Sequence, residues 1–414
     1  MGRRGDAGSD AGLITLEEAG VRAAALVEPV PGVLDLPLVE ADGRVLAQAV
    51  VAPIDLPRFA NAAVDGYTVR SADLAPDTET RLPVLGRAAA GEPAGTLERG
   101  AWRIFTGAAI PEGADTVVMQ EDVEAGDGEV VLSPGVVGGA NLRRAGEDVA
   151  RGTEVLPAGC RLRPQDLGLL AALGLERVPV RRRPRVALFS TGDELTEPGQ
   201  ALSAGAIYDA NRAMLRSLLV RAGADVADLG ILRDERSELE RHLREAAGAC
   251  DLVVTSGGVS VGEADHVKAS VAACGSLDLW RVAIKPGKPI AVGEVAATPF
   301  IGLPGNPVAV YVGFMFVALP LLARLAGASF EAPIALAVTA GFRHRRKPGR
   351  REFLRVTLER GDDGAVIARK HPGEGAGSLA SLVHSHGLVV LGEERQQVED
   401  GDSLPFLSHG GLLG

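Results

Sequence analysis

Short apolar runs and longer amphipathic stretches alternate through the centre of the chain. They predict strands at 185–190, 224–229 and 251–255, and helices at 209–222, 235–249 and 263–274. Alternation of this kind is typical of a doubly wound parallel sheet with helices on both faces. Because ligands of such sheets bind beyond the carboxyl ends of the strands, we expect the chemistry in the loops that follow.

The sequence on either side of this region consists mainly of short β-like runs. Strands are predicted at 81–86, 116–120 and 129–132, and then at 334–339, 353–358, 365–369 and 387–391. The last four indicate a small C-terminal β barrel. The expected fold class is multidomain, α/β plus β-rich. A disordered tail at 1–12 precedes a mixed α+β domain, which is discontinuous and consists of 13–51 and 145–183. A β-rich domain at 52–144 is inserted into it, and a central α/β domain at 184–330 and a C-terminal β domain at 331–410 follow.

The most apolar segment, 308–322, predicts a buried helix. Gly313 and Pro320 interrupt it, and it is shorter than the roughly 18 apolar residues that a membrane span needs. Asn306 and Pro307 fit the N-cap and first positions of the helix. We therefore expect no contact with a membrane.

The composition argues against several classes of protein. Among the 414 residues, 43 Lys and Arg against 54 Asp and Glu give a net charge of −11, which disfavours a nucleic-acid-binding protein. Cys160, Cys250 and Cys274 are widely spaced, which excludes a disulfide framework and indicates a reducing compartment. The Gly- and Arg-rich N-terminus is followed by no signal-peptide core, so we expect a cytoplasmic protein.

Lysine is scarce, and its positions are informative. Of the 43 cations 38 are arginines, and the five lysines are Lys268, Lys285, Lys288, Lys347 and Lys370. Two of the five share the stretch Lys285-Pro286-Gly287-Lys288. A compact, strongly hydrated point charge suits an oxyanion, so this loop predicts an oxyanion site. A surface turn around Pro-Gly is the alternative.

The loop after the first central strand gathers oxygen ligands. It reads Ser190-Thr191-Gly192-Asp193-Glu194 and carries two hydroxyls and two carboxylates. A carboxylate pair is electrostatically costly without a cation, and hard oxygen ligands suit Mg²⁺. The alternative is that Asp193 or Glu194 caps the next element.

The loop after the third central strand is rich in glycine. It runs through Ser256, Gly257, Gly258 and Ser260 to Asp265 and then into a helix. Glycine lets backbone N–H groups approach an anion, and a helix N-terminus favours phosphate, so a phosphate cradle is predicted. The glycine spacing is that of neither a Walker A loop nor a dinucleotide fingerprint. A rigid turn follows at 302–307, where Pro304 and Pro307 fix the backbone of a site wall.

Further candidates lie in turns and fit either a structural or a functional role. They are Asp65 and Thr106 in the β-rich region, Arg143 and Asp148 at its border, the pair His384 and His386, and Ser378 in a glycine-rich loop. For the histidine pair a solvent-facing turn is favoured over metal binding, because no carboxylate or Cys stands at the usual spacing.

Taken together, these motifs resemble the molybdopterin molybdenumtransferase family, which includes the E domain of gephyrin. The resemblance runs from about residue 13 to 407 and rests on six motifs in order: Asp65-Gly66-Tyr67, Arg143-Arg144-Ala145-Gly146-Glu147-Asp148, Ser190-Thr191-Gly192-Asp193-Glu194-Leu195, Ser256-Gly257-Gly258-Val259-Ser260-Val261-Gly262, Lys285-Pro286-Gly287-Lys288-Pro289 and Gly302-Leu303-Pro304-Gly305-Asn306-Pro307.

The resemblance implies a reaction and a set of partners. Adenylylated molybdopterin is bound, molybdate is inserted at the dithiolene, and the pyrophosphate linkage is cleaved to release AMP and molybdenum cofactor. A divalent cation, usually Mg²⁺, assists. The α/β domain resembles molybdopterin adenylyltransferase, and the family's elongated homodimer places the cleft between subunits. A molybdopterin adenylyltransferase and molybdoenzyme maturation proteins are the protein partners that this role suggests.

The family's functional residues carry over position by position. The resemblance implies catalytic roles for Asp65, Thr106, Asp148, Glu194, Asp234, Asp265 and Lys285, with Glu194, Asp234 and Asp265 as metal ligands. It implies substrate binding by Arg143, Arg281, Pro304, Pro307 and Ser378. The loops described above add the expected substrate-binding residues Ser190, Thr191, Gly192, Ser256, Gly257, Gly258, Ser260 and Lys288.

The chain departs from the family pattern at two places. Ala62-Ala63-Val64 stands where Ser-Ala-Met is frequent, and Arg281 stands where Lys is common. Arginine keeps the charge but changes its geometry, which puts a molybdate contact at Arg281 in doubt. Two other functions stay open: an adenylyltransferase-like enzyme, against which the flanking domains speak, and a dimeric scaffold that binds a receptor peptide.

Overall fold

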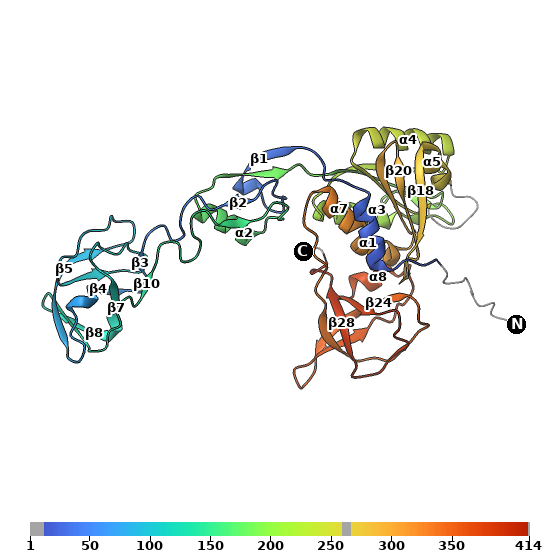
Figure 1. Cartoon of the computed structure of the whole chain (residues 1–414). Coiled ribbons are helices and arrows are strands. Elements are labelled where there is room, and N and C mark those ends of the chain that lie inside the picture. The colour runs from blue at the N-terminus through green and yellow to red at the C-terminus, as the bar shows by residue number, and fades with distance from the viewer. Residues whose placement is uncertain (1–11, 259–265, 413–414) are drawn as a thin grey trace.

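The computed structural model describes residues 12–258 and 266–412. The molecule is elongated, with the β-rich domain at one end and the α/β and C-terminal domains together at the other (Figure 1). Residues 1–11 of the predicted tail lie outside the described residues, as do Ser260 and Asp265.

The central domain is built on a six-stranded sheet. Its strand order is β16-β13-β17-β21-β20-β18. The bounds are Arg185–Thr191 for β13, Asp225–Leu232 for β16, Leu252–Ser256 for β17, Gly275–Arg281 for β18, Pro289–Val295 for β20 and Thr298–Leu303 for β21. The first three confirm the predicted strands. The prediction of a parallel sheet is correct for β16, β13, β17 and β21 but wrong for β20 and β18, which run antiparallel.

A hairpin with an unusual turn explains this error. β20 and β21 are joined by Ala296 and Ala297, which have φ values of 46° and 68°. Two-residue hairpins need positive φ at both turn positions, and Asn or Gly is the usual residue there. With alanine in both positions, the sequence lacks the signal by which such a hairpin is recognised.

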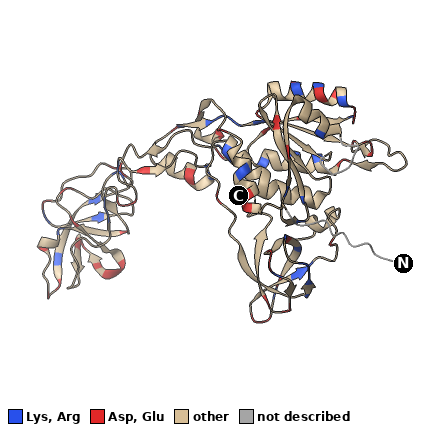
Figure 2. Ribbon diagram, turned by 45° about the vertical axis from the view of Figure 1, so that its right-hand side comes forward, with Lys and Arg blue, Asp and Glu red and all other residues tan. Residues whose placement is uncertain are grey.

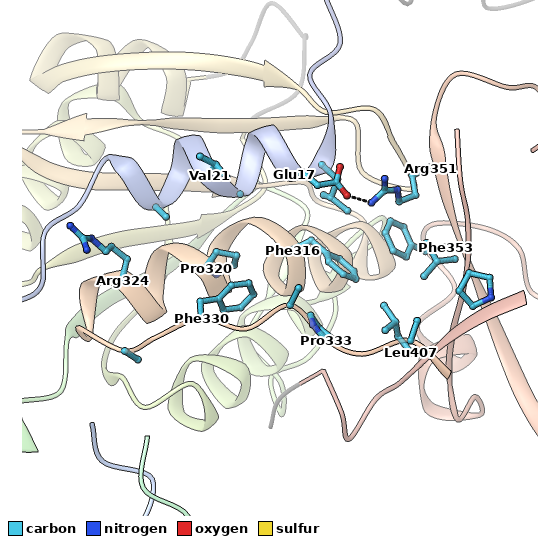
Figure 3. Close-up of a pocket in the computed structure, with 18 residues that line it drawn as sticks. Glu17, Val21, Phe316, Pro320, Arg324, Phe330, Pro333, Arg351, Phe353 and Leu407 are labelled. Carbon is cyan, nitrogen blue, oxygen red and sulfur yellow. Dashed lines mark hydrogen bonds and ion pairs between the residues drawn. The ribbon is translucent and has the colours of Figure 1, made fainter. Parts of the chain in front are cut away.

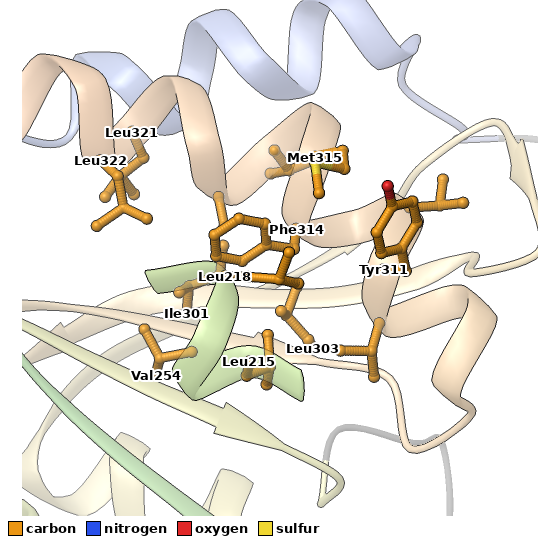
Figure 4. Close-up of a cluster of buried hydrophobic side chains, with 14 of the residues drawn as sticks. Leu215, Leu218, Val254, Ile301, Leu303, Tyr311, Phe314, Met315, Leu321 and Leu322 are labelled. Carbon is orange, nitrogen blue, oxygen red and sulfur yellow. The ribbon is translucent and has the colours of Figure 1, made fainter. Parts of the chain in front are cut away.

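Helices cover both faces of the sheet, as expected. They are α3 (Ala210–Arg221), α4 (Arg236–Ala249), α5 (His266–Cys274), α6 (Pro307–Gly313), the π-helical turn η4 (Phe314–Ala318) and α7 (Leu319–Leu325). Helices α4 and α5 pack on one face around Phe189 and Phe300. On the other face, α3, α6, η4 and α7 bury a larger cluster that includes Leu215, Phe314 and Leu322 (Figure 4).

The predicted apolar helix is confirmed as part of this core. Residues Pro307–Leu325 are long and apolar enough to cross a membrane, but 83% of their most apolar window is buried inside the protein. Pro307 occupies the first position and Asn306 the N-cap, although the Asn306 side chain donates or accepts no capping hydrogen bond.

The N-terminal segment contributes to two domains. Helix α1 (Leu16–Ala25) is N-capped by Thr15, whose hydroxyl accepts a hydrogen bond from the N–H of Glu18 at 3.2 Å. It lies within the expected N-terminal domain but packs on η4 and α7, with Leu16 and Ala19 in the α/β core. Residues 33–51 pack instead against residues 154–181, around a core that includes Leu46 and Leu170. The elements here are β1 (Val33–Pro37), η1 (Leu38–Glu40), β2 (Val50–Val51), β11 (Glu154–Leu156), α2 (Pro164–Ala172) and β12 (Arg177–Arg181).

The β-rich domain contains a six-stranded sheet of order β7-β4-β6-β5-β9-β8. Its strands are β4 (Gly66–Val69), β5 (Thr80–Ala88), β6 (Ala101–Ile104), β7 (Thr116–Met119), β8 (Val123–Gly126) and β9 (Glu129–Leu132), with the single turns η2 (Ser71–Asp73) and η3 (Gln120–Asp122). At its border β3 (Asn61–Ala62) pairs with β10 (Leu142–Arg143). The three strands predicted here are confirmed.

The C-terminal domain is the predicted small barrel. Five strands close on themselves in the order β24-β25-β22-β28-β26. They are β22 (Leu336–Ala340), β24 (Arg351–Arg360), β25 (Val366–Lys370), β26 (Gly387–Leu391) and β28 (Ser403–Ser408). The same domain contains helix α8 (Leu379–Val383) and the strand pair β23 (His344–Arg345) with β27 (Gln397–Val398). Strand β19 (Ile284–Lys285) pairs with the edge of β24. A further short pair, β14 (Leu195–Thr196) with β15 (Ile207–Tyr208), belongs to the α/β domain.

Candidate functional site

Three predicted site loops leave the sheet side by side. In the parallel register Ser190 of β13 pairs with Ser256 of β17, and Ser256 pairs with Leu303 of β21. The loops that begin at Gly192, Gly257 and Pro304 therefore start at the same edge of the sheet. This confirms the expected geometry, in which the carboxyl ends of neighbouring strands present their loops together.

The glycine turn after β17 has a conformation that other residues rarely adopt. Gly257 and Gly258 have φ values of +90° and +64°. A Cβ atom on Gly258 would lie 2.5 Å from Cγ2 of Val267, and one on Gly257 would lie 3.0 Å from the carbonyl oxygen of Thr191. Glycine is required here both by the backbone angles and by the space available.

Asn211 joins these loops, and sequence reasoning missed it. Its side-chain amide donates to the Ser256 hydroxyl at 2.9 Å and to the Gly305 carbonyl at 2.6 Å. The Ser256 hydroxyl in turn donates to the carbonyl of Pro304 at 3.2 Å. An available signal was the position of Asn211 in the first turn of α3, a helix that follows the loop carrying Glu194.

Several polar atoms in this region are buried and have no hydrogen-bond partner among residues 12–258 and 266–412. They are Ser190 Oγ, Thr191 Oγ1, Thr255 Oγ1, Asn211 Oδ1 and Asp234 Oδ1. A buried polar group without a partner costs about 1–3 kcal/mol. Five such atoms at and beside the carboxyl ends of β13 and β17 indicate a ligand that supplies the missing donors and acceptors.

Of the three predicted metal ligands, Glu194 and Asp234 lie near each other, and Asp265 lies outside the described residues. Burial raises the pKa of Asp234, and the nearby carboxylates of Asp193 and Glu194 raise it further, whereas His266 lowers it. Within 12–258 and 266–412, no group of three or more His, Cys, Asp or Glu residues could hold a metal ion. The unpartnered Asp234 oxygen and the adjacent carboxylates have the donor chemistry of a hard-cation site.

The lysine loop lines a cavity of about 460 Å³ together with the barrel. Lys285, Lys288 and Lys370 all line it, so three of the five lysines of the chain meet here. Arg350 and Arg355 also line the cavity, against the carboxylates Glu352 and Glu374. The lining therefore carries more positive than negative groups, although the whole chain is acidic. The sequence predicted Lys285 and Lys288 here but not Lys370 or the arginines.

The cavity adjoins the sheet-edge loops through two contacts. Gly287 of the lysine loop packs against Ala309 of α6, at a distance of 3.3 Å between the position of a Cβ on Gly287 and the Ala309 Cβ. The N–H of Val308, next to Pro307, donates to the carbonyl of Ala376 in the loop that carries Ser378. The structure thus brings Pro304, Pro307 and Ser378 to the border between the two regions. Arg281 ends β18, just before the lysine loop.

The candidates in the β-rich domain form a separate group. Asp65 accepts hydrogen bonds from the N–H and the hydroxyl of Thr106, both at 2.8 Å, and these hold its pKa below the usual range. Arg143 donates to Glu147 at 2.7 Å, and the N–H of Asp148 donates to the carbonyl of Leu56. Within one chain this group lies at the far end from the α/β loops (Figure 1). The histidine pair lies in the barrel, where His386 Nδ1 accepts a hydrogen bond from the N–H of Leu358.

A larger cavity, of about 600 Å³, lies between α1, η4 and the barrel. Its lining is mostly apolar, and Val21, Phe316, Phe330 and Phe353 face it (Figure 3). The ion pair of Glu17 and Arg351 lies at one end. Lacking convergent unpaired polar groups among its lining residues, this cavity is a poorer candidate for a polar substrate than the sheet edge and the lysine cavity.

Comparison with known proteins covers nearly the whole chain. Residues 14–174 match the family MoeA N-terminal region (domain I and II), residues 187–324 match the probable molybdopterin binding domain, and residues 337–408 match the MoeA C-terminal region (domain IV). The molybdopterin molybdenumtransferase of Haemophilus influenzae is 40% identical over 383 residues, which cover 92% of this chain and 94% of that protein. The chain belongs to the molybdopterin molybdenumtransferase family.

Other members of the molybdopterin molybdenumtransferase family agree with this assignment. Molybdopterin molybdenumtransferase 2 of Mycobacterium tuberculosis is 38% identical over 385 residues, covering 90% of this chain and 94% of that one. The molybdopterin biosynthesis moeA protein of Pyrococcus horikoshii has a similar structure, with a TM-score of 0.82 and 30% identity over 96% of this chain and all of that one. The resemblance read from the six motifs is confirmed.

Proposed function

We propose that the protein is a molybdopterin molybdenumtransferase, which binds adenylylated molybdopterin, inserts molybdate at the dithiolene and releases AMP. One observation supports this assignment above the others. A loop cluster with unpartnered polar atoms directly adjoins a cavity lined by three of the five lysines. The first suits a polar pterin nucleotide and the second suits a small oxyanion.

The residues divide the work by their chemistry. The N–H of Gly258 and the hydroxyl of Thr191 bind phosphate and pterin oxygens. Gly257 and Ser256 shape the turn, because the N–H of Gly257 donates to the carbonyl of Leu303 and the Ser256 hydroxyl donates to that of Pro304. Lys285 and Lys288, with Arg281 nearby, offset the charge of the oxyanion. The rigid backbone at Pro304 and Pro307 and the Ser378 loop form the wall that separates the two.

Mg²⁺ is the cation that we assign to Glu194, Asp234 and Asp265. Carboxylate oxygens are its preferred protein ligands, and the unpartnered Asp234 oxygen supports the choice. When bound, the cation polarises a phosphoanhydride, as Lewis acids do in phosphoryl and nucleotidyl chemistry. The carboxylates would hold the cation, and the donors of the glycine turn would hold the substrate phosphates.

We propose that the protein is a homodimer, and the separation of the two groups of candidates supports this. Asp65, Thr106, Arg143 and Asp148 lie in a domain that does not reach the α/β loops of its own chain (Figure 1). In a dimer they face the α/β loops of a second copy and complete the cleft there. The enzyme acts in the cytoplasm on small molecules, and a molybdopterin adenylyltransferase and molybdoenzyme maturation proteins are its protein partners.

The direct test is release of AMP from adenylylated molybdopterin. Purified full-length protein with Mg²⁺ should release AMP in a molybdate-dependent manner, and chelation of the metal should stop the release. Lys285→Ala should lower the rate at least about tenfold, because it removes a charge that binds the oxyanion. Lys347→Ala is the matched control, since Lys347 is exposed on the barrel.

Two outcomes would point to the other functions. AMP transfer from ATP to molybdopterin, without molybdate-dependent release of AMP, would favour an adenylyltransferase. Folded protein without either activity would favour a scaffold.

A further inference from the structure

The lysine loop is held between two distant parts of the chain. On one side the N–H of Ile14 donates to the carbonyl of Arg281, and the N–H of Ala283 donates to the carbonyl of Ile14, at 3.0 and 2.8 Å. On the other side the N–H of Arg351 donates to the carbonyl of Ala283 at 2.7 Å. There β19 pairs in parallel with β24, with Lys285 opposite Glu352. The backbone of Lys285 is therefore fixed by the barrel.

Glu352 fixes the side chain of Lys285 as well. It is 4% exposed, and its Oε1 lies 2.6 Å from Nζ of Lys285. Its Oε2 lies 3.1 Å from Nε2 of His344 and 3.4 Å from Nε of Arg346, both in the C-terminal domain. Burial alone would raise the pKa of Glu352, but hydrogen bonds with Lys285 and His344 bring it below the usual range. The carboxylate thus links the barrel to the lysine.

The two partners differ in exposure. The side chain of Lys285 is 52% exposed, whereas that of Glu352 is 6% exposed. The ammonium group thus remains accessible from the cavity, with the carboxylate behind it. A free lysine side chain has about 2 kcal/mol of rotamer entropy, which an anion must overcome when it binds. Holding the side chain before the anion arrives removes part of that cost.

We propose that Glu352 is a positioning residue that holds the ammonium group of Lys285 ready for the oxyanion. The inference rests on the proposed function, because it assigns the oxyanion to the lysine cavity. His344 extends the arrangement, since its Nδ1 lies 3.1 Å from Nζ of Lys370, another lysine of the cavity. The barrel thus sets the position of two of the three lysines through one buried carboxylate.

A second glutamate of the same cavity provides a matched control. Glu374 lines the cavity and forms an ion pair with Lys370, but its side chain is 60% exposed, whereas that of Glu352 is 6% exposed. Electrostatics alone predicts that both Glu352→Gln and Glu374→Gln tighten oxyanion binding, since each removes one negative charge. Positioning predicts opposite results for the two variants.

The experiment measures molybdate binding to the full-length protein by isothermal titration calorimetry, with AMP release as a second assay. Wild-type protein that binds molybdate and releases AMP establishes the proposed function. Glu352→Gln should then weaken molybdate binding about tenfold and raise KM for molybdate more than it lowers kcat. Glu374→Gln should tighten binding by up to about fivefold. Glu352→Asp, which keeps the charge on a shorter side chain, should give intermediate affinity. Binding by Glu352→Gln that is as tight as wild type, or tighter, would overturn the proposal.

A measurement on the wild-type protein keeps the proposal testable if Glu352→Gln fails to fold. With five lysines, ¹³Cε labelling gives a simple lysine spectrum, and Lys285→Arg assigns the relevant signal. Relaxation should show a more restricted Cε at Lys285 than at exposed Lys347. Equal mobility at the two positions would contradict the positioning role, whatever the outcome of the activity assay.

Discussion

Replacing Gly258 by alanine tests the glycine turn at the centre of the site. The residue has φ of +64°, where an L-residue costs about 1–2 kcal/mol relative to glycine. The added Cβ would also lie 2.5 Å from Cγ2 of Val267, a side chain that is 1% exposed in α5. Overpacking of this kind costs about 1–3 kcal/mol. Gly258→Ala should therefore lower the free energy of unfolding by about 2–5 kcal/mol.

Urea unfolding of the full-length protein measures this loss. The chain has two tryptophans, so in a Trp102→Phe background the fluorescence of Trp280, on β18, reports on the α/β domain. Adding Val267→Ala should relieve the clash and recover about 1–3 kcal/mol in a double-mutant cycle. Gly248→Ala is the control, because a Cβ there meets no atom within 4 Å and alanine favours α4 by up to about 1 kcal/mol.

The same substitution tests the role of the turn in binding. A shifted turn displaces the Gly258 N–H that is assigned to phosphate, so KM for adenylylated molybdopterin should rise about 10- to 100-fold. A Gly258→Ala protein with wild-type stability and wild-type KM would refute both the steric and the functional argument.

Three further substitutions probe contacts elsewhere. Asn211→Ala removes the bonds to Ser256 and Gly305, so kcat/KM should fall at least about tenfold and stability by about 1–3 kcal/mol; unchanged kinetics would exclude Asn211 from the site. Thr106→Val removes one of two hydrogen bonds to Asp65, so NMR titration should show the pKa of Asp65 rising toward its usual value. Burial raises the pKa of Asp251, but the bidentate hydrogen bonds from Arg182 lower it below its usual range. The ionised Asp251 therefore stabilises the fold at a pH above its pKa in the unfolded chain, and this stabilisation is lost as the pH falls through its pKa in the folded protein. Asp251→Asn should therefore be less stable by about 1–3 kcal/mol at pH 7, and urea titrations should show the difference shrinking below about pH 4.

The sequence predicted the parts of the fold that depend on local patterns. The apolar runs at 186–189 and 252–254 mark β13 and β17. Amphipathic stretches mark α3 and α4, because burial of one helix face requires that spacing. The hairpin of β20 and β21 escaped prediction because Ala296 and Ala297 carry no turn signal. Local sequence cannot reveal a turn whose positive φ values are imposed by the pairing of its flanking strands.

The candidate site divides in the same way. The residues at the ends of β13 and β17 could be predicted, since strand ends of a parallel sheet meet at one edge. Lys370, Arg355 and Glu352 could not, because they reach the lysine loop only through the closure of the barrel and its pairing with β19. Such non-local pairing leaves no periodic trace around the residues that it brings together.

The domains that line the lysine cavity determine how much positive charge is available to a bound anion. Both signs of charge occur on every domain (Figure 2), and charges more than about 10 Å apart are largely screened at 0.1 M salt, so the net charge of −11 says little about the affinity of one small anion. What matters is the local excess of cations in the lysine cavity, to which the barrel contributes Arg350, Arg355 and Lys370. An isolated α/β unit could offer its sheet-edge loops to a pterin nucleotide but would retain only Lys285 and Lys288 for the oxyanion. If the oxyanion binds in the lysine cavity, as proposed, the barrel is the part of the molecule that distinguishes insertion of an oxyanion from adenylylation alone.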